Sequence, residues 1–387
     1  MSQLKLGVIG RTGKENERRV PIHPHHLDRI DADLLGSIYF ERGYGDDFGV
    51  SDAQLAELAA GVRSREELIA ECDVILLIKP DARDLAELRV GQALWGWPHC
   101  VQDRELTQQA IDRRQTLIAF EAMNLWGDDG AFKLHVFHKN NEMAGYCSVL
   151  HAFQIVGLTG MYGRRLRAAV IGFGATARGA VTALGAHGVH DVDILTNRGV
   201  TEVASPIHSA EIFQFEHDVD PAGGPTESFA LTPDGRVPLA GYLAEHDVVV
   251  NCVLQDTNAP LTFLDEGDLA AFPSGSLIID VSCDEAMGFS WAHPTTFEQP
   301  TFEVGTNNIT YYAVDHSPSY LWDSASWEIS EALLPYLRTV LDGREAWEAD
   351  QTVRRAIEIL DGNIQNPDIL SFQDRVPDYP HAGTDTR

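Results

Sequence analysis

The segment from residue 168 to residue 197 constrains the fold of this chain more than any other. An apolar strand, AAVIGFG, runs into a helix, ATARGAVTALGAHG, and a second apolar strand, VDILTN, follows. The turn between the first strand and the helix carries Gly172, Gly174 and Ala177 in the pattern G-x-G-x-x-A. This setting predicts the βαβ unit of a dinucleotide-binding domain.

Each small residue in this turn has a physical task. Gly172 permits the tight turn, Gly174 lets a pyrophosphate approach the backbone, and Ala177 allows the helix to pack closely on the strand. The helix begins at Ala175 and Thr176, whose N–H groups offer hydrogen bonds and a partial positive charge to phosphate. The alternative is a structural turn without a ligand, but the complete βαβ setting favours the binding function.

The end of the second strand indicates which dinucleotide is bound. NAD-selective sites usually place a carboxylate there, which accepts a hydrogen bond from the ribose 2′-hydroxyl. This chain has Thr196, Asn197 and Arg198 instead, and these side chains can donate to a 2′-phosphate. We therefore expect NADP (as NADPH) rather than NAD, unless Arg198 is only a solvated loop residue.

Length, charge and cysteine usage bound the other options. A chain of 387 residues is too long for one ordinary core, so two domains are expected. The net charge of -29 argues against a nucleic-acid or an anionic-membrane partner. The five scattered cysteines form no C-x-x-C pair, and the N-terminus carries no secretory signal. We therefore expect a cytoplasmic protein with reduced thiols.

Short apolar strands and helices alternate on both sides of the βαβ unit. Strands are predicted at 4–9, 37–40, 73–78, 93–97, 116–120, 247–253 and 276–281, and helices at 52–60, 105–114, 141–157 and 327–341. Buried strands separated by helices imply an α/β fold with parallel sheets. The polar, turn-rich residues 199–240 are interpreted as an irregular insertion with a lost or distorted strand. The tail from residue 362 is expected to be disordered or to form an arm on a neighbouring subunit.

Cationic side chains follow several predicted strands. Lys79 and His99 each come directly after a buried strand, and a proline beside each one ends that strand. Reactive groups gather beyond the carboxyl ends of strands in open α/β domains. A lysine there can bind a carboxylate or polarise a carbonyl or imine, and a histidine can transfer a proton near neutral pH. Arg18 and Arg19, after the first strand, could clamp a substrate carboxylate.

Other polar residues are less specific. Asp280 and Asp284 follow the strand SLIID in the nucleotide-binding half. Taken singly, each candidate has an ordinary alternative as a surface cation, a loop histidine, or a turn or cap residue, and only their joint placement favours a site. His23, His25 and His26 superficially suggest a metal cluster, but the intervening proline favours a loop that enters a helix. No metal is expected.

Beyond these patterns, the chain resembles the family of alanine dehydrogenase and N5-(carboxyethyl)ornithine synthase. The resemblance spans most of the chain, through KENERRVPIHP, DVILLIKP, GQALWGWPH, IAFEAMN, KNNEMAGY, VIGFGATARG, LIIDVSCDEA and YYAVDHSPSYLWDSAS. The double arginine, the GW-x-H strand end and the basic end of the second nucleotide strand are closer to the carboxyethyl-ornithine branch, which uses NADPH. One departure is Asp315-His316-Ser317-Pro318, where alanine dehydrogenases have A-N-M-P.

The resemblance implies a role for each matching residue. Arg19 would bind the substrate carboxylate, with Arg18 sharing this contact. Lys79 would contact the carboxylate and the keto or imine group, and His99 would be the catalytic acid/base. Asp284 would close the site near the nicotinamide, whereas the neighbouring aspartate four residues earlier would be structural.

The resemblance also implies two Rossmann-like domains with a cleft between them. Residues 1–140 and 319–387 would form a discontinuous substrate domain, and residues 141–318 the dinucleotide-binding domain. The implied function is NADPH-dependent reductive condensation of a pyruvate-like 2-oxo acid with the amine of an ornithine-like or lysine-like amino acid. The alternatives are an NAD(P)-dependent alanine dehydrogenase, with ammonia as the amine, and a nucleotide-binding sensor. A homo-oligomer acting on small molecules is expected.

Overall fold

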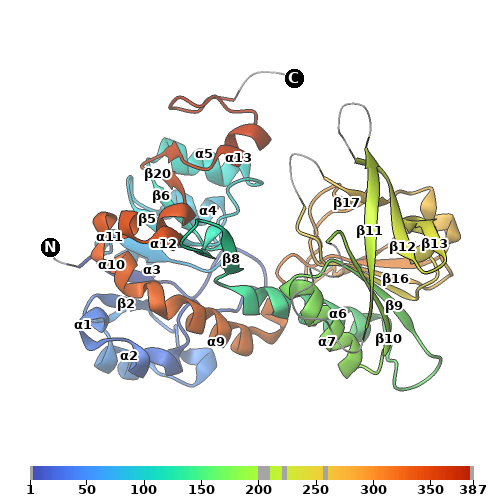
Figure 1. Cartoon of the computed structure of the whole chain (residues 1–387). Helices are drawn as coiled ribbons and strands as arrows, with labels where there is room; N and C mark the ends of the chain where they lie inside the picture. The colour runs from blue at the N-terminus through green and yellow to red at the C-terminus, as the bar shows by residue number, and fades with distance from the viewer. Residues whose placement is uncertain (1–2, 199–209, 220–224, 256–259, 384–387) are drawn as a thin grey trace. The chain divides into compact units, whose positions relative to one another are not determined.

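The structure is a computed structural model that describes residues 3–198, 210–219, 225–255 and 260–383. The chain divides into two compact units (Figure 1). Unit 1 comprises Met1–His138 and Leu321–Arg387, and unit 2 comprises Lys139–Tyr320. Each unit has its own sheet and its own apolar core, and both sheets are rich in parallel strands, as the predicted α/β class requires.

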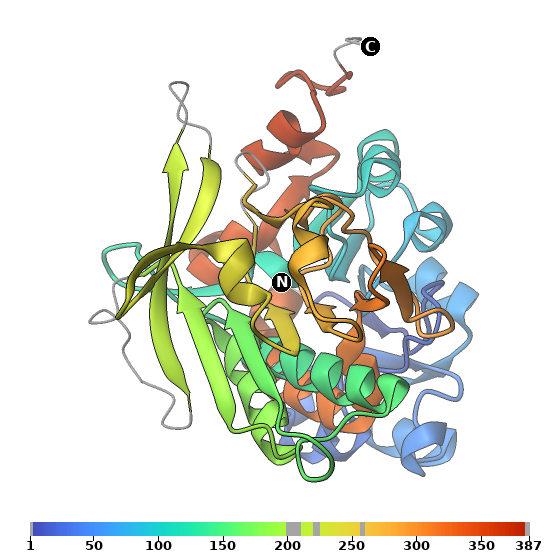
Figure 2. The ribbon, with the colours of Figure 1, turned by 90° about the vertical axis from the view of Figure 1, so that its right-hand side faces the viewer.

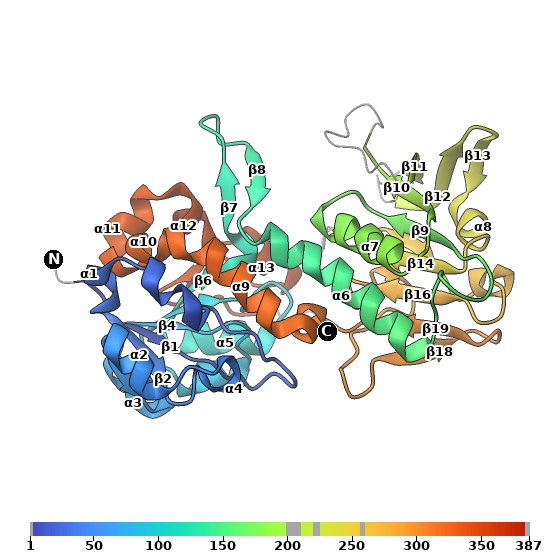
Figure 3. The same cartoon turned by 90° about the horizontal axis from the view of Figure 1, so that it is seen from below.

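Among the described residues, unit 1 folds around a sheet of eight strands in the order β21-β20-β6-β5-β4-β1-β2-β3. The strands from β6 to β3 are parallel: β1 (Leu6–Val8), β2 (Ile38–Glu41), β3 (Gly61–Arg63), β4 (Val74–Leu76), β5 (Ala93–Gly96) and β6 (Thr116–Ala119). Separate apolar clusters cover the two faces. Burial on both faces is typical of parallel sheets and explains continuous apolar runs such as DVILLI. A hairpin of β7 (Asn124–Trp126) and β8 (Phe132–His135) stands away from this sheet (Figure 3).

Short helices cover the unit 1 sheet, and polar caps explain where several begin. Ser51, Ser64 and Asp81 each accept hydrogen bonds from the first turn of the helix that follows. The predicted helix at 327–341 is interrupted by a 3-10 turn at Leu334–Tyr336, which contains a proline. The helices are α1 (Ala32–Leu35), α2 (Asp52–Leu58), α3 (Arg65–Glu71), α4 (Ala82–Glu87), α5 (Arg104–Asp112), α9 (Trp322–Leu333), α10 (Leu337–Asp342), α11 (Arg344–Ala349), α12 (Gln351–Ala356) and α13 (Pro367–Phe372). Within the part of the chain that the structure describes, no helix combines the length and apolar content that crossing a membrane requires.

The C-terminal tail is part of unit 1, so the prediction of a disordered segment or a subunit arm is wrong for its described residues. Strand β20 (Ile357–Leu360) pairs antiparallel with β6, and β21 (Asn363–Ile364) extends the sheet. After α13, Gln373 is buried and donates from Nε2 to the carbonyl oxygen of Cys100, at 2.7 Å. A few isolated buried apolar side chains anchor the tail, and they are too sparse to produce a periodic pattern in the sequence.

In the described part of unit 2, nine strands form a sheet in the order β13-β12-β11-β10-β9-β14-β16-β19-β18. The predicted βαβ unit is present as β9 (Arg167–Ile171), α7 (Ala175–Ala186) and β10 (Asp191–Thr196). The strands from β11 to β19 are parallel. Further elements of this unit are α8 (Leu239–Leu243), β14 (Val248–Asn251), β15 (Thr262–Leu264), β16 (Leu277–Asp280), β17 (Gly288–Phe289), β18 (Thr301–Val304) and β19 (Ile309–Tyr312).

Much of the segment interpreted as an irregular insertion is regular, so that prediction is wrong for its described residues. Strand β11 (Glu211–Val219) pairs in parallel with β10, and β12 (Pro225–Thr232) and β13 (Gly235–Pro238) return antiparallel. Figure 2 shows this yellow-green ribbon at one edge of the sheet. Phe215 and Ala230 are buried, whereas the residues beside them are exposed or only partly buried, so the segment shows no continuous buried run. Residues 199–209 and 220–224 lie outside the described residues.

Helix α6 (His138–Val156) lies against α7, and glycines bring the two backbones together (Figure 3). A Cβ atom added to Gly179 would lie 1.7 Å from the carbonyl oxygen of Glu142, and one added to Gly145 would lie 1.9 Å from that of Thr176. Neither position can hold a side chain unless the helices separate. The glycines therefore fix how closely α6 supports the nucleotide-binding helix.

We expect Gly179→Ala to lower the melting temperature by several degrees, because the added methyl group overlaps backbone rather than a movable side chain. Overpacking of this kind costs about 1–3 kcal/mol. The matched control is Gly185→Ala, also in α7, where an added Cβ meets no atom within 4 Å. Differential scanning calorimetry of both variants tests the claim, and equal melting temperatures would contradict it.

Candidate functional site

The register of unit 1 brings two of the predicted catalytic residues to one edge of the sheet. Leu76 of β4 lies beside Trp95 of β5 in the parallel ladder. Lys79 and His99 follow these two residues closely, so both side chains leave the sheet at its carboxyl end. Adjacent strands lie about 4.8 Å apart, so Lys79 and His99 start from neighbouring positions. Their catalytic roles remain predictions.

The loop that carries His99 has an unusual conformation. His99 has a φ of +49°, in the left-handed region that residues with side chains rarely adopt. Its backbone N–H donates to Oε1 of Glu121, at 2.6 Å, and its Nδ1 lies 4.0 Å from the same oxygen. Glu121 follows β6, the strand beside β5. This carboxyl group therefore holds the loop in its strained shape and faces the imidazole.

Glu121 has a partner acid that the sequence did not indicate. Glu358 lies in β20 at a register shift between Ile357 and Ile359, and this bulge leaves its side chain buried. Within the described residues, the Oε2 atoms of Glu121 and Glu358 are buried without a hydrogen-bond partner. A buried carboxylate oxygen without a donor is costly, which favours a proton on the pair. Glu121 could have been predicted from the motif IAFEAMN, because this acid follows a buried strand. No sequence pattern indicated the bulge that holds Glu358.

The two acids affect each other's ionisation. Burial raises the pKa of Glu121 well above its ordinary value, and the charge of Glu358 raises that pKa further, while the charge of Lys79 opposes the rise. Burial also raises the pKa of Glu358, although Asn366 donates to its Oε1 at 3.1 Å. The pair therefore retains a proton more readily than isolated carboxyl groups do, directly beside the imidazole.

Arg18 and Arg19 were predicted to share one carboxylate, but their guanidinium groups face different surroundings. Arg19 is buried and donates from Nε and Nη2 to the carboxylate of Glu17, at 2.8 and 2.5 Å. Its guanidinium lies 5.5 Å from the centre of the Trp97 ring, at the end of β5. The half-exposed Arg18 instead lies over the Trp322 ring, 4.4 Å from its centre. Of the two, Arg19 lies toward the strand that carries the histidine.

The predicted dinucleotide turn joins β9 to α7 in unit 2. Gly172 has a φ of +111°, which glycine adopts far more readily than other residues. A side chain at Gly174 would meet no atom within 4 Å, so the surface at the start of the helix is open, whereas Ala177 is fully buried. The first turn of α7, from Ala175 and Thr176, has backbone N–H groups without helical partners. An open, glycine-lined helix start of this kind fits a pyrophosphate group.

The end of β10 and the two residues after it carry polar and cationic side chains. The N–H of Gly172 donates to the carbonyl oxygen of Leu195, at 2.7 Å, so the end of β10 lies beside the dinucleotide turn. Thr196 is buried, and its Oγ1 accepts a hydrogen bond from the N–H of Arg198, at 3.1 Å. Asn197 and Arg198 are exposed. A cation and two polar side chains, with no carboxylate, occupy residues 196–198.

Asp280 is held as part of the unit 2 core. It is fully buried at the end of β16 and accepts hydrogen bonds from Asn251 Nδ2 at 2.9 Å, from the N–H of Cys283 at 3.1 Å, and from the Tyr311 hydroxyl at 2.6 Å. Burial raises the pKa of Asp280 to about 6, although these three donors oppose the rise. All three contacts join strands and a loop of unit 2.

Asp284 lies in a strained loop just beyond β16. The residues Cys283 and Ala286 beside it have φ values of +48° and +54°, which are rare for residues with side chains. Burial raises the pKa of Asp284 to about 6. Strained backbone and shifted ionisation are both typical of functional positions, so Asp284 remains the candidate acid of unit 2.

Replacing Asp284 with asparagine should stabilise the protein at pH 7.5. The folded chain keeps this carboxyl protonated up to about pH 6, whereas its ordinary pKa is 3.8. Its contribution to stability is therefore full below about pH 4 and is lost as the pH rises through 6. Because asparagine does not ionise, we expect Asp284→Asn to gain about 1–3 kcal/mol at pH 7.5 and nothing at pH 4.

Thermal unfolding between pH 4 and pH 8 measures this difference. The control is Asp234→Asn, at an exposed turn in the same unit. A gain at Asp284 that stays constant across the pH range, or one that the control reproduces, would contradict the interpretation.

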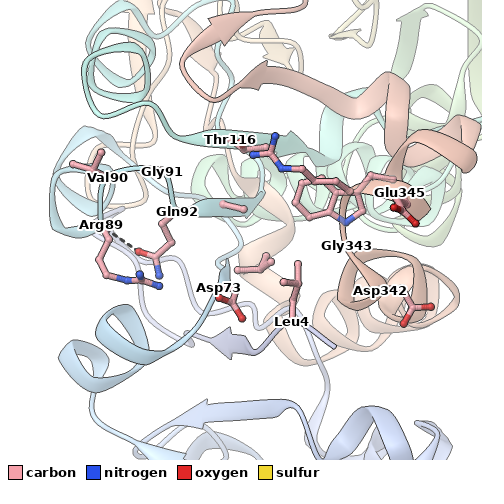
Figure 4. A pocket seen from close by; sticks show the side chains of 14 residues that line it. Leu4, Asp73, Arg89, Val90, Gly91, Gln92, Thr116, Asp342, Gly343 and Glu345 are labelled. Atoms are coloured by element: carbon pink, nitrogen blue, oxygen red, sulfur yellow. Dashed lines mark hydrogen bonds between the residues drawn. The ribbon is translucent and has the colours of Figure 1, made fainter. Parts of the chain in front are cut away.

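Another cavity of unit 1 lies at the opposite, amino-terminal edge of the sheet (Figure 4). It has a volume of about 460 Å³, and its polar lining includes Asp73, Gln92, Asp342 and Glu345. Its two arginines are engaged, since Arg89 donates to the carbonyl oxygens of Ile69 and Cys72, and Arg344 pairs with Asp361. This cavity offers no cation for a carboxylate.

The histidine cluster has structural partners. His23 caps a 3-10 helix, Pro24–Arg29, that includes both His25 and His26. His23 Nε2 lies 3.0 Å from the carboxylate of Asp323, and His26 Nδ1 lies 2.9 Å from the hydroxyl of Ser330. These contacts tie the loop to α9. In the ranges that the structure describes, no group of three or more histidine, cysteine or acidic side chains is arranged to hold a metal ion.

Two family models match consecutive parts of the chain. The alanine dehydrogenase/PNT N-terminal domain matches residues 9–144, and the corresponding C-terminal domain matches residues 154–367. An N(5)-(carboxyethyl)ornithine synthase of Clostridium botulinum is 24% identical over 339 residues, which cover 85% of this chain and 92% of that protein. An alanine dehydrogenase of Mycobacterium tuberculosis is 25% identical over 352 residues, which cover 89% of each.

Solved structures show the same likeness at the level of the fold. An L-alanine dehydrogenase matches with a TM-score of 0.73 at 19% identity, over 95% of this chain and 99% of that one. A transhydrogenase from Sinorhizobium meliloti matches with a TM-score of 0.68 at 18% identity, over 94% and 99%. Relatives named for two different reactions thus have nearly the same identity to this chain, and identity does not choose between those reactions.

Proposed function

We propose that this chain, which belongs to the alanine dehydrogenase/PNT family, is an NADPH-dependent oxidoreductase that condenses a 2-oxo acid with the amine of an amino acid. The observation that carries the proposal is the carboxyl edge of the unit 1 sheet. There Lys79 and His99 leave adjacent strands, with the partly buried acid Glu121 behind the histidine. A cation for the oxo acid and a proton-transfer group are the two functions that imine formation requires.

In the proposed reaction, Lys79 holds the carboxylate of the 2-oxo acid, and Arg19, oriented by Glu17, supplies the second cation. The amine attacks the keto carbon and forms a carbinolamine. Protonated His99 gives its proton to the carbinolamine hydroxyl, which leaves as water, and a protonated imine remains. Glu121 faces Nδ1 of His99 and orients the ring for this transfer.

The cofactor assignment is part of the proposal. Gly172, Gly174 and the start of α7 at Ala175 and Thr176 would hold the pyrophosphate, while Thr196, Asn197 and Arg198 would hold the 2′-phosphate. When bound, the nicotinamide supplies the hydride that reduces the imine carbon. Asp284, whose pKa is raised by burial to about 6, is the unit 2 side chain that we assign to the nicotinamide end.

Alanine dehydrogenase activity is the second candidate, because a relative of that name is as similar as the ornithine-modifying one. The two reactions share every step except the identity of the amine, which is ammonia in the second. A nucleotide-binding sensor without catalysis is a third possibility, and the placement of Lys79 beside His99 argues against it.

The deciding experiment measures NADPH oxidation with pyruvate and other 2-oxo acids, each paired with ammonia, ornithine, lysine or a simple alkylamine. Turnover that requires an amino acid as the amine supports the proposal. Turnover with ammonia alone supports an alanine dehydrogenase, and none with any pair supports the sensor.

Lys79→Ala should reduce turnover at least a thousandfold and leave the affinity for NADPH within about twofold, since it removes the carboxylate contact and a charge beside the reacting carbon. NADPH binding is measured by fluorescence titration. The control, Lys133→Ala, changes an exposed lysine on β8 and should behave like the parent protein. Retention of full activity by Lys79→Ala would remove this lysine from the proposed mechanism.

Arg198→Ala should raise the KM for NADPH about tenfold to a hundredfold, because charge-assisted hydrogen bonds to a phosphate are worth about 1.5–3 kcal/mol. The KM for NADH should not change, because NADH lacks the 2′-phosphate, and it serves as the internal control. Steady-state kinetics with both cofactors makes the comparison. A parent protein that prefers NADH would contradict the cofactor assignment.

A further inference from the structure

A second cavity in unit 1 lies at the same sheet edge as Lys79 and His99. It has a volume of about 290 Å³ and opens beyond the carboxyl ends of β1 and β2. Its lining holds both signs of charge, with the cations Arg11, Arg18 and Arg42 and the acids Glu17, Glu41 and Asp47. The proposed reaction uses only Glu17 of this set, as the partner of Arg19, and leaves the cavity itself without a function.

The walls of this cavity are fixed by hydrogen bonds. The N–H of Gly10 donates to Oε2 of Glu41, at 2.9 Å, and joins the end of β1 to the end of β2. The Tyr44 hydroxyl donates to the carbonyl oxygen of Ile22, at 2.7 Å, and accepts from its N–H, at 3.0 Å. Tyr44 thereby secures the loop that carries Arg18 against β2. A cavity built in this way is preorganised for a ligand.

Arg18 and Asp47 form a pair of opposite charges within this cavity. Their Nη2 and Oδ2 atoms are 3.6 Å apart, and the ring of Trp322 holds the guanidinium from one side. A guanidinium beside a carboxylate complements the head group of an amino acid, which has a carboxylate beside an ammonium. Glu41, whose Oε2 already accepts from Gly10, is a second acid in the lining of the cavity.

The distance along the sheet edge matches the size of a diamino acid. In the strand order β5-β4-β1-β2, His99 and Lys79 follow the first two strands and the cavity lies beyond the last two. At about 4.8 Å per strand, the cavity begins roughly 5–10 Å from the proposed reaction centre. From the side-chain amine to the carboxylate, extended ornithine or lysine spans roughly 7–9 Å. Because Arg18 and Arg19 face different surroundings, Arg19 can bind the carboxylate of the 2-oxo acid while Arg18 binds the carboxylate of the diamino acid.

We propose that the cavity beside Arg18 binds the α-carboxylate and α-ammonium groups of the amine substrate, with Arg18 on the carboxylate and Asp47 on the ammonium. This inference rests on the proposed function and adds to it the residues that select the amine. It makes the enzyme specific for an amine that is the side-chain end of an amino acid, since a simple alkylamine leaves the cavity unfilled.

The test compares L-ornithine and L-lysine with propylamine, which has an amine but no head group, as partners of pyruvate in NADPH oxidation. Arg18→Gln should raise the KM for the preferred diamino acid at least tenfold and leave the KM for pyruvate and for propylamine unchanged. Asp47→Asn should act in the same direction. The matched control is Arg63→Gln, a partly exposed arginine of β3 that lies outside the cavity.

The outcomes separate this inference from the function on which it rests. If the parent protein oxidises NADPH with propylamine as efficiently as with ornithine and lysine, reductive condensation of an amine stands, but both the preference for an amino acid and the cavity assignment are wrong. The cavity assignment is also wrong if Arg18→Gln leaves the diamino-acid KM unchanged. If no amine, or ammonia alone, supports turnover, the proposed function fails and the cavity assignment fails with it. Melting temperatures of the variants within about 2 °C of the parent exclude loss of folding as the cause.

Discussion

Hydrogen bonding between parallel strands in register is the constraint on which the rest of this structure depends. In unit 1 it aligns the carboxyl ends of β6, β5, β4, β1 and β2 along one edge, so that segments far apart in the sequence contribute neighbouring side chains. Glu121, His99, Lys79 and the Arg18 cavity follow one another along that edge in strand order. A slip of one residue in any of these strands would turn its side chains to the other face.

Burial then sets the chemistry of the acids. In a chain with a net charge of -29, Glu358 and Asp280 are carboxylates buried from water, and Glu121 and Asp284 are partly buried. Removing their charged forms from water raises each pKa, and each acid lies at a strand end, a strained loop or a bulge. The proposed reaction takes up a proton when water leaves, and the raised pKa of Glu121 beside His99 suits that step.

Periodicity and turn chemistry predicted the elements that depend on local residues. The apolar strands, the βαβ unit with its glycines, and α6 are all found close to the predicted positions. The predictions failed where regular structure depends on distant partners. Strands β11 to β13 have polar outer faces and bury only a few side chains. The tail is held by isolated contacts, such as the hydrogen bond from Gln373 to Cys100. Neither leaves a periodic signal, because the apolar surface that covers these segments comes from elsewhere in the chain.

The sequence by itself determined the α/β class, the dinucleotide turn and the strand-end positions of Lys79 and His99, because each follows from the order of apolar runs, glycines and prolines along the chain. Only the tertiary structure decided which side chains meet. In the folded chain Glu121 lies close to Glu358, at a bulge in β20. The side chains of the consecutive residues Arg18 and Arg19 lie in different surroundings. Such contacts depend on the direction of each side chain after the strands are aligned, and a linear pattern does not carry that direction.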